Sequence, residues 1–196
     1  PGKRYNAAPT QELPVITAES PTIEMMRWGL IPFWAKDKSI GTKLINARAE
    51  TLVEKPSFRT SFRKRRGLVA SDGFYEWKKT AHGKVPMFIH LASGEPFAIA
   101  GLWDEWNDPE SGATVRSFTI ITTEPNEMMA DIHNRMPAIL RREDEKLWLD
   151  PHADEQELLH ALRPFPAEEM EAWPVSTVVN NPKNDDPSLI EPMPEE

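Results

Sequence analysis

The chain has 196 residues, of which 39% are hydrophobic and 28% charged, and it contains no cysteine, which excludes a disulfide-stabilised scaffold. No apolar run approaches the ~20 residues of a membrane-spanning helix, and the basic N-terminus lacks the apolar segment of a secretory signal, so we expect a cytoplasmic protein with no membrane partner. The net charge of −8 divides into +7 for residues 1–98 and −15 for residues 99–196, which predicts either a basic binding surface on the first half or an uneven scatter of solvated charges.

Short strands with a few helices are the expected elements, because β-branched and aromatic runs alternate with amphipathic, capped segments. In chain order we expect a helix at 57–66 after Pro56, strands at 67–78, 85–91, 97–106 and 115–122, a hairpin turn at 93–96, and helices at 126–132, 141–149 and 154–163. The tail after residue 173 should be extended, with 192–196 frayed. We therefore predict one α+β domain over residues 1–196, with a mostly antiparallel sheet or barrel-like core and a few flanking helices.

An amide, a guanidinium and a carboxylate alternate at period two in the segment 44–50. On an extended backbone Asn46, Arg48 and Glu50 would share one face. This pattern is typical of a polar site, and equally of an exposed strand face with an Arg–Glu pair.

A second polar group, Glu76, stands between Tyr75 and Trp77 at the end of an apolar run. A carboxylate held among aromatic rings is desolvated, and its pKa rises towards the range that suits general acid–base chemistry. Gly73 would permit a bend or the close approach of a ligand. The alternative is an outward-facing glutamate that pairs with a neighbouring lysine.

The third group is His133, at the exit of the helix expected at 126–132. Histidine both gives and takes a proton near neutral pH, and Asp131 or Asn134 could fix its orientation. A surface histidine without a function is the alternative. The absence of cysteine and the scatter of the five histidines predict no metal site and no cofactor.

Two further segments are candidates for contacts with nucleic acid. Residues 28–34 carry aromatic rings in a stretch too rich in Pro and Gly for a regular element, and such rings can stack on unpaired bases, whereas Trp28 fits core packing better. Residues 55–66 carry six basic residues. On a helix, Phe58 and Phe62 would face inward, and an outward stripe would either bind phosphates or be solvated; its members are Arg59, Arg63 and Arg66.

Taken together, five motifs resemble the SRAP (SOS response associated peptidase) family in their order and spacing. They are RYNAAP from Arg4, WGLIP from Trp28, LINARAET from Leu44, DGFYEW from Asp72 and DIHNRMP from Asp131. The resemblance implies a protein that binds single-stranded DNA and senses abasic sites. Members join themselves to the open-chain aldehyde through an N-terminal Cys, whose α-amine forms a Schiff base and whose thiol closes a thiazolidine. It also implies a monomer, and association with the nucleoid if the source is bacterial.

Motif by motif, the resemblance implies site roles for nine residues. Asn46, Glu76 and His133 match the supporting catalytic residues, and Arg48 and Arg135 match phosphate-binding positions. The positions beside the DNA are matched by Pro9, Phe33 and Trp34, and less closely by Thr122. An acid–base pair beside an orienting amide fits Schiff-base formation, which moves protons to and from oxygen.

The chain departs from the family at the nucleophile. The expected Cys-Gly-Arg-Phe start ahead of Arg4 is absent, and the first residue is Pro1 rather than Met, so we expect that an N-terminal segment is missing. These 196 residues alone lack the thiol that a thiazolidine requires. The other readings are a non-catalytic module that binds single-stranded DNA and a thiol-dependent, self-processing peptidase.

Overall fold

The computed structural model describes residues 2–20 and 22–194. The strands of this part are β1 (Glu12–Thr17), β2 (Glu24–Trp28), β3 (Asn46–Arg48), β4 (Arg66–Ser71), β5 (Phe74–Thr80), β6 (Gly83–Leu91), β7 (Phe97–Asn107), β8 (Thr114–Thr123), β9 (Met136–Pro137) and β10 (Met170–Pro174). The helices are α1 (Arg59–Lys64), α2 (Glu127–Ala130), α3 (Arg142–Leu149) and α4 (Glu155–Ala161), with 3-10 turns η1 (Lys38–Lys43), η2 (Ala49–Thr51), η3 (Ala167–Glu169), η4 (Thr177–Asn180) and η5 (Pro187–Ile190). The α+β class is confirmed.

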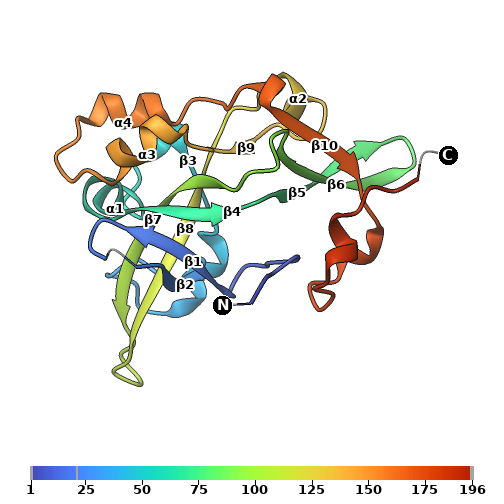
Figure 1. The fold of residues 1–196 in the computed structure, drawn as a ribbon. Coiled ribbons are helices and arrows are strands. Elements are labelled where there is room, and N and C mark those ends of the chain that lie inside the picture. The colour runs from blue at the N-terminus through green and yellow to red at the C-terminus, as the bar shows by residue number, and fades with distance from the viewer. Residues whose placement is uncertain (1, 21, 195–196) are drawn as a thin grey trace.

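The larger sheet closes on itself as a barrel (Figure 1). Its order is β2-β1-β4-β7-β8, and β2 also pairs with β8, where Arg27 lies opposite Ser117 and Trp28 opposite Phe118. Further along β8, the short strand β3 takes up the next positions, with Asn46 opposite Ile120. The pairs that β2 and β3 make with β8 are parallel, and the remaining pairs of the two sheets are antiparallel. The expected barrel-like core is therefore present.

A smaller sheet of order β10-β6-β5 lies beside the barrel (Figure 1). The single strand expected at 67–78 is wrong, because the chain leaves the barrel after β4, bends at Asp72 and Gly73, and enters the small sheet as β5. Gly73 is required at this bend, since a Cβ there would lie 2.3 Å from the Phe88 ring. The hairpin expected at 93–96 is also wrong, because the strands on either side of it, β6 and β7, belong to different sheets.

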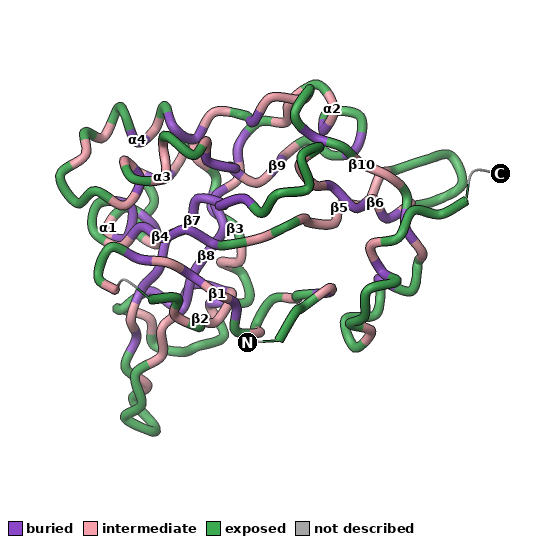
Figure 2. The backbone as a smooth tube through the Cα atoms, in the orientation of Figure 1, coloured by how far each residue is buried: buried purple, intermediate pink, exposed green. Residues whose placement is uncertain are grey.

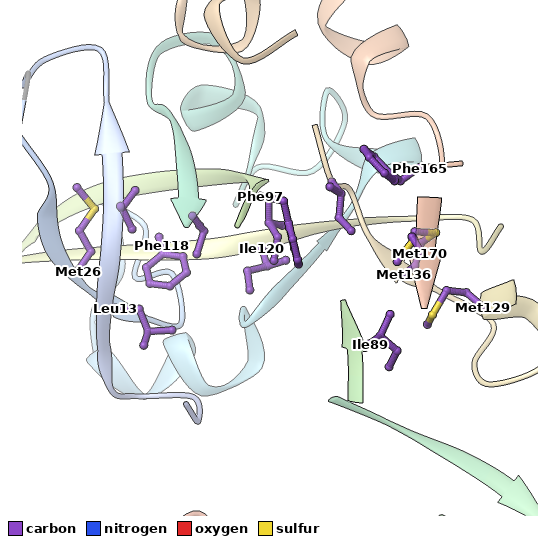
Figure 3. Packing of buried hydrophobic residues seen from close by; sticks show 14 of the residues in the cluster. Leu13, Met26, Ile89, Phe97, Phe118, Ile120, Met129, Met136, Phe165 and Met170 are labelled. Atoms are coloured by element: carbon purple, nitrogen blue, oxygen red, sulfur yellow. The ribbon is translucent and has the colours of Figure 1, made fainter. Parts of the chain in front are cut away.

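A continuous apolar core joins the two sheets. Figure 3 shows side chains that run from Leu13 and Phe118 in the barrel to Ile89 and Met170 in the small sheet. A second cluster packs helices α1, α3 and α4 on the barrel around the fully buried Trp148. Figure 2 shows buried residues concentrated along the barrel strands β4, β7 and β8, and exposed residues in most of the connecting loops.

Helix α1 is shorter than the expected 57–66, and Arg66, which follows it, is buried rather than exposed. Phe58 and Phe62 face the core, as expected, at 3% and 1% exposure. The prediction that Arg66 belongs to an exposed stripe of the helix is wrong, because Arg66 begins β4 and is 6% exposed. Its guanidinium donates to the carbonyl oxygens of Phe62 and Trp148, so it closes the ends of α1 and α3.

The N-terminal segment is fixed to the C-terminal loops by a cluster that we call the clasp, formed by Tyr5, Asn6, Asp185 and the loop 179–184. The buried Asn6 amide nitrogen lies 3.0–3.2 Å from the carbonyl oxygens of residues 179, 181 and 184. One oxygen of Asp185 accepts the backbone N–H groups of Tyr5 and Asn6 at 2.6 and 3.0 Å. The Tyr75 hydroxyl of β5 donates to the Tyr5 carbonyl at 2.7 Å, so the clasp also contacts the small sheet.

Strands β1, β2, β9 and β10 were not expected from the sequence, and β10 ends at Pro174, the first residue of the tail expected to be extended. In the tail expected to be frayed, 192–196, the amide of Met193 donates to the Pro174 carbonyl at 2.9 Å, which holds it in place. Residues 195 and 196 lie outside the described residues. No helix between residues 2 and 194, residue 21 aside, has the length and apolar character to span a membrane.

Candidate functional site

The two titratable groups that the sequence singles out lie close together although 57 positions separate them. Glu76 comes from β5, and His133 follows α2. Glu76 Oε1 lies 3.8 Å from His133 Nδ1, and the side chains are 26% and 42% exposed. This distance is longer than a hydrogen bond, so the two groups do not bind each other. Both can therefore contact a ligand atom that lies between or beside them.

The surroundings of Glu76 differ from the prediction. Successive side chains of a strand point to opposite faces, so Tyr75 and Trp77 turn away from it. The Tyr75 hydroxyl donates to the clasp, and Trp77 Nε1 donates to the side chain of Asn180 at 2.7 Å. The aromatic rings therefore do not enclose the carboxylate. Burial nevertheless raises the pKa of Glu76 above its ordinary value, and the opposing influence of His133 is smaller.

The orientation of His133 is set by backbone rather than by the expected Asp131 or Asn134 side chains. The backbone N–H of Arg135 donates to His133 Nδ1 at 3.1 Å. The same nitrogen lies 3.2 Å from the Arg135 carbonyl oxygen, to which it donates in the tautomer that carries the proton on Nδ1. In either tautomer the Arg135 backbone holds the Nδ1 edge of the ring.

Asn46, Arg48 and Thr122 lie side by side at the edge of the barrel. Asn46 and Arg48 are exposed positions of β3 with Ala47 buried between them, and Arg48 pairs with Thr122 of β8. Within the described residues, the side chain of Asn46 makes no hydrogen bond. Its amide and the Arg48 guanidinium are therefore available to a ligand at this edge.

Arg135 is already engaged by protein groups. Its guanidinium forms two bonds with Glu50, at 2.7 and 3.0 Å, and donates to the Thr122 carbonyl at 2.7 Å. The hydrogen bond from Arg135 lowers the pKa of Glu50. The expectation that Glu50 shares a strand face with Arg48 is wrong, because β3 ends at Arg48 and Glu50 lies in η2.

The predicted DNA-side aromatic residues lie on a separate loop, which follows β2. Phe33 and Trp34 are 55% and 46% exposed. Trp28, in contrast, stacks on Phe118 with ring centroids 6.5 Å apart, so its assignment to core packing is correct. The exposed Pro9 lies in the turn before β1, where Thr10 N–H donates to the Trp28 carbonyl at 2.8 Å, next to the start of the aromatic loop.

The structure also contains contacts that the sequence did not indicate. The partner of Arg135 is Glu50, 85 positions away, and the clasp joins residues about as far apart as the chain allows. Nothing in the local pattern signals such pairs, whereas the five motifs do indicate Glu76 and His133. In the described part of the chain, no group of three or more His, Asp or Glu side chains is placed to hold a metal ion.

Comparisons with known proteins identify the family of the chain. The family described as SOS response associated peptidase (SRAP) matches residues 1–182, so the chain belongs to this family. It is 51% identical over 191 residues to the abasic site processing protein YoqW of Bacillus subtilis, which covers 95% of this chain and 85% of that protein. It is 34% identical over 222 residues to the abasic site processing protein HMCES of Xenopus tropicalis, with coverage of 95% and 65%.

The fold is likewise shared with a solved structure. A crystal structure of a protein from Bacteroides thetaiotaomicron matches with a TM-score of 0.88 at 35% identity, covering 94% of this chain and 82% of that chain. The similarity thus includes both sheets and most of the connecting loops.

Proposed function

We propose that this chain binds single-stranded DNA and acts at its abasic sites, as a monomer and as part of the response to DNA damage. The observation that carries the proposal is the Glu76–His133 pair, 3.8 Å apart, with the carboxylate largely buried. Relatives from bacteria and vertebrates are named abasic site processing proteins, and their matches cover 95% of this chain. A monomer suffices because one chain supplies all the proposed site residues other than the N-terminal cysteine.

The proposed chemistry is the capture of the ring-opened abasic aldehyde by an N-terminal cysteine placed ahead of these residues. The α-amine adds to the aldehyde carbon, the carbonyl oxygen takes a proton, and the carbinolamine loses water to give an imine. The thiol then adds to the imine carbon and its proton passes to the nitrogen, so that aminothiol and aldehyde become thiazolidine and water. No oxidant or metal is needed.

Glu76 supports this sequence because burial raises its pKa above the ordinary value of a carboxyl group, which favours general acid–base catalysis. We assign to it the proton transfer to the departing oxygen. His133, which is more exposed, exchanges protons with solvent, and the Asn46 amide orients the sugar oxygen. Each of these groups lies on a strand or next to one, which limits its movement.

The strand-edge guanidinium of Arg48 is the leading phosphate ligand in this proposal, because Arg135 is paired with Glu50. Phosphate contacts hold the backbone without reading sequence, so binding should be similar for different sequences and should weaken with salt. Pro9, Phe33 and Trp34 would contact the bases, and Thr122 would line the floor beside Arg48.

The test uses the protein with a cysteine at its N-terminus and a single-stranded oligonucleotide that contains one abasic site. Glu76→Gln should form the crosslink roughly 10²–10⁴-fold more slowly while binding the intact strand about as tightly, because the titrating group is lost and the shape is kept. His133→Ala should lose less, since water replaces a group on the open side.

A matched control is available on the same sheet. Glu171 on β10 lies 3.8 Å from His90, the same spacing as Glu76 and His133, but outside the site. Glu171→Gln should crosslink at the wild-type rate. An unchanged rate in Glu76→Gln would refute its catalytic role, and equal losses of rate and affinity would indicate a module that only holds DNA.

A further inference from the structure

The aromatic loop, residues 29–37, has no strand partner for most of its length, yet three of its backbone groups bind buried side chains. Ile31 N–H donates to Ser117 Oγ at 2.8 Å, and Phe33 N–H donates to Asp104 Oδ2 at 2.9 Å. The Ala35 carbonyl accepts a hydrogen bond from Trp106 Nε1 at 2.7 Å. Residues 31, 33 and 35 of the loop are therefore attached to β7 or β8.

The three supporting side chains are among the most buried polar groups of the barrel. Ser117, Asp104 and Trp106 are 0%, 2% and 3% exposed. A buried polar group is costly unless it is hydrogen-bonded, so each of them favours the one loop conformation that satisfies it.

Asp104 makes the strongest of the three supporting hydrogen bonds because its side chain is a carboxylate. Its second oxygen accepts the Glu105 N–H at 2.8 Å and is ion-paired with Arg65. Arg65 and Arg116 lie over the Trp103 ring at 5.4 and 4.9 Å, so cationic side chains surround the base of the support. A charged acceptor makes the bond to Phe33 stronger than a neutral one would.

The base of the loop is fixed in a further way. Gly29 has a φ of +121°, and a Cβ there would lie 2.6 Å from the Gly41 carbonyl oxygen, so two backbone segments cross without room for a side chain. The loop therefore begins from a defined direction.

This attachment leaves the two large rings in solvent. Phe33 and Trp34 are 55% and 46% exposed, although apolar surface of this size favours burial. Trp34 lines a shallow hollow of about 380 Å³ whose charged lining residues are two lysines and one aspartate, Lys36, Lys43 and Asp37. A ring beside two ammonium groups suits a base and its phosphate.

We propose that Asp104, Ser117 and Trp106 are positioning residues that hold Phe33 and Trp34 as a preformed platform on which unpaired bases stack. The inference rests on the proposed function, since it takes single-stranded DNA as the ligand. A loop ordered during folding needs no ordering when DNA binds, so its support contributes to affinity without touching the ligand.

Ser117→Ala is the sharpest test, because Thr119 of the same strand provides a matched control. Thr119 is fully buried, and its hydroxyl has no hydrogen-bond partner among the described residues, so Thr119→Val removes a hydroxyl without releasing the loop. Asp104→Asn and Trp106→Phe test the other two supports. Two quantities are measured: hydrogen exchange of the amides of residues 31 and 33, and affinity for a labelled single-stranded oligothymidine without abasic sites.

Ser117→Ala and Asp104→Asn should speed exchange at these amides and weaken oligothymidine binding about 2- to 10-fold, the equivalent of one hydrogen bond. Thr119→Val should change neither quantity. Trp34→Ala should weaken binding by about fivefold or more through lost stacking.

The remaining outcomes overturn the proposal in distinguishable ways. Unchanged exchange in all three support variants would show that these bonds do not order the loop. Faster exchange with unchanged affinity, while Trp34→Ala still weakens binding, would show that the platform needs no support. If wild-type protein does not bind oligothymidine, or if Trp34→Ala has no effect, the assignment of the loop to single-stranded DNA fails.

Discussion

The barrel and the small sheet present different kinds of group to the candidate site. The edge of the barrel carries the exposed guanidinium of Arg48 and, before β9, the guanidinium of Arg135, which is paired with Glu50, and the small sheet contributes one largely buried carboxylate, Glu76. A guanidinium suits phosphate at the surface because it stays charged in water. A carboxyl group suits proton transfer only after its pKa has risen, and burial achieves this.

This difference shows why the site requires two sheets. The guanidinium groups need contact with water, whereas the carboxyl group needs removal from water. A few neighbouring residues on one exposed strand edge cannot provide both environments. The bend at Gly73 moves the chain from the barrel into the small sheet, and Glu76 follows three residues later. The relative placement of the sheets therefore sets the Glu76–His133 distance.

The clasp offers the largest expected effect on that placement. Asn6→Ala removes a buried amide nitrogen that contacts three carbonyl oxygens and leaves the buried Val179 carbonyl without its donor, so we expect the free energy of unfolding to fall by about 2–3 kcal/mol. Urea unfolding measures it. Asn107→Ala is the control, because its exposed side chain lies outside the clasp and accepts one bond, from the Thr114 hydroxyl, and it should cost about 1 kcal/mol or less. Equal losses would mean that the clasp has no special role.

The pH dependence of the free energy of unfolding tests whether Glu76 is buried enough to differ from the exposed groups at the barrel edge. Because burial raises the pKa of Glu76, the folded state binds its proton more tightly than the unfolded state does. This stabilisation is complete below the unfolded pKa of ~4.3 and is lost as the pH rises through the folded value. Wild type should thus lose stability relative to Glu76→Gln between pH 4 and neutrality.

Urea unfolding of both proteins at several pH values checks this trend. When both proteins also carry His133→Ala, the loss of stability with rising pH should be larger, since His133 opposes the effect of burial on the pKa of Glu76. A stability difference that is constant with pH, or that has the opposite sign, would contradict a raised pKa.

Arg48→Ala tests the other side of the comparison. It should weaken binding to single strands of every sequence alike and reduce the slope of log affinity against log salt by about 1, because one phosphate contact is lost. Arg63→Ala on α1, whose side chain is 63% exposed, is the control for a solvated arginine and should leave the slope unchanged. The same loss in both variants would make α1 part of the DNA surface.

Glu50→Gln should have the smallest effect. The pair with Arg135 is partly exposed, so its loss should change stability by about 1 kcal/mol or less. Removing a negative charge next to Arg48 and releasing Arg135 should raise affinity for single-stranded DNA by a few fold at low salt. Titrations at two salt concentrations measure this, and weaker binding would show instead that Glu50 holds Arg135 in its binding position.

Local pattern predicted the α+β class, three of the strands in outline (β6, β7 and β8) and the inward faces of Phe58 and Phe62, because apolar periodicity is a property of adjacent residues. It failed at residues 67–78, where an apolar run continues across a bend between two sheets. A short-range pattern contains no signal that assigns two halves of one run to different sheets. Arg66 was misplaced for a related reason, since its carbonyl partner at Trp148 is 82 positions away.

The sequence by itself determined which residue types are present at the site: the five motifs contain Asn46, Arg48, Glu76, His133 and Arg135. Tertiary structure decided which groups these side chains contact. It turned Tyr75 and Trp77 away from Glu76, paired Arg135 with Glu50, and placed Ser117 and Asp104 under the aromatic loop. Burial and pairing depend on groups that only folding brings together, so neither a pKa shift nor an ion pair can be assigned from residue order alone.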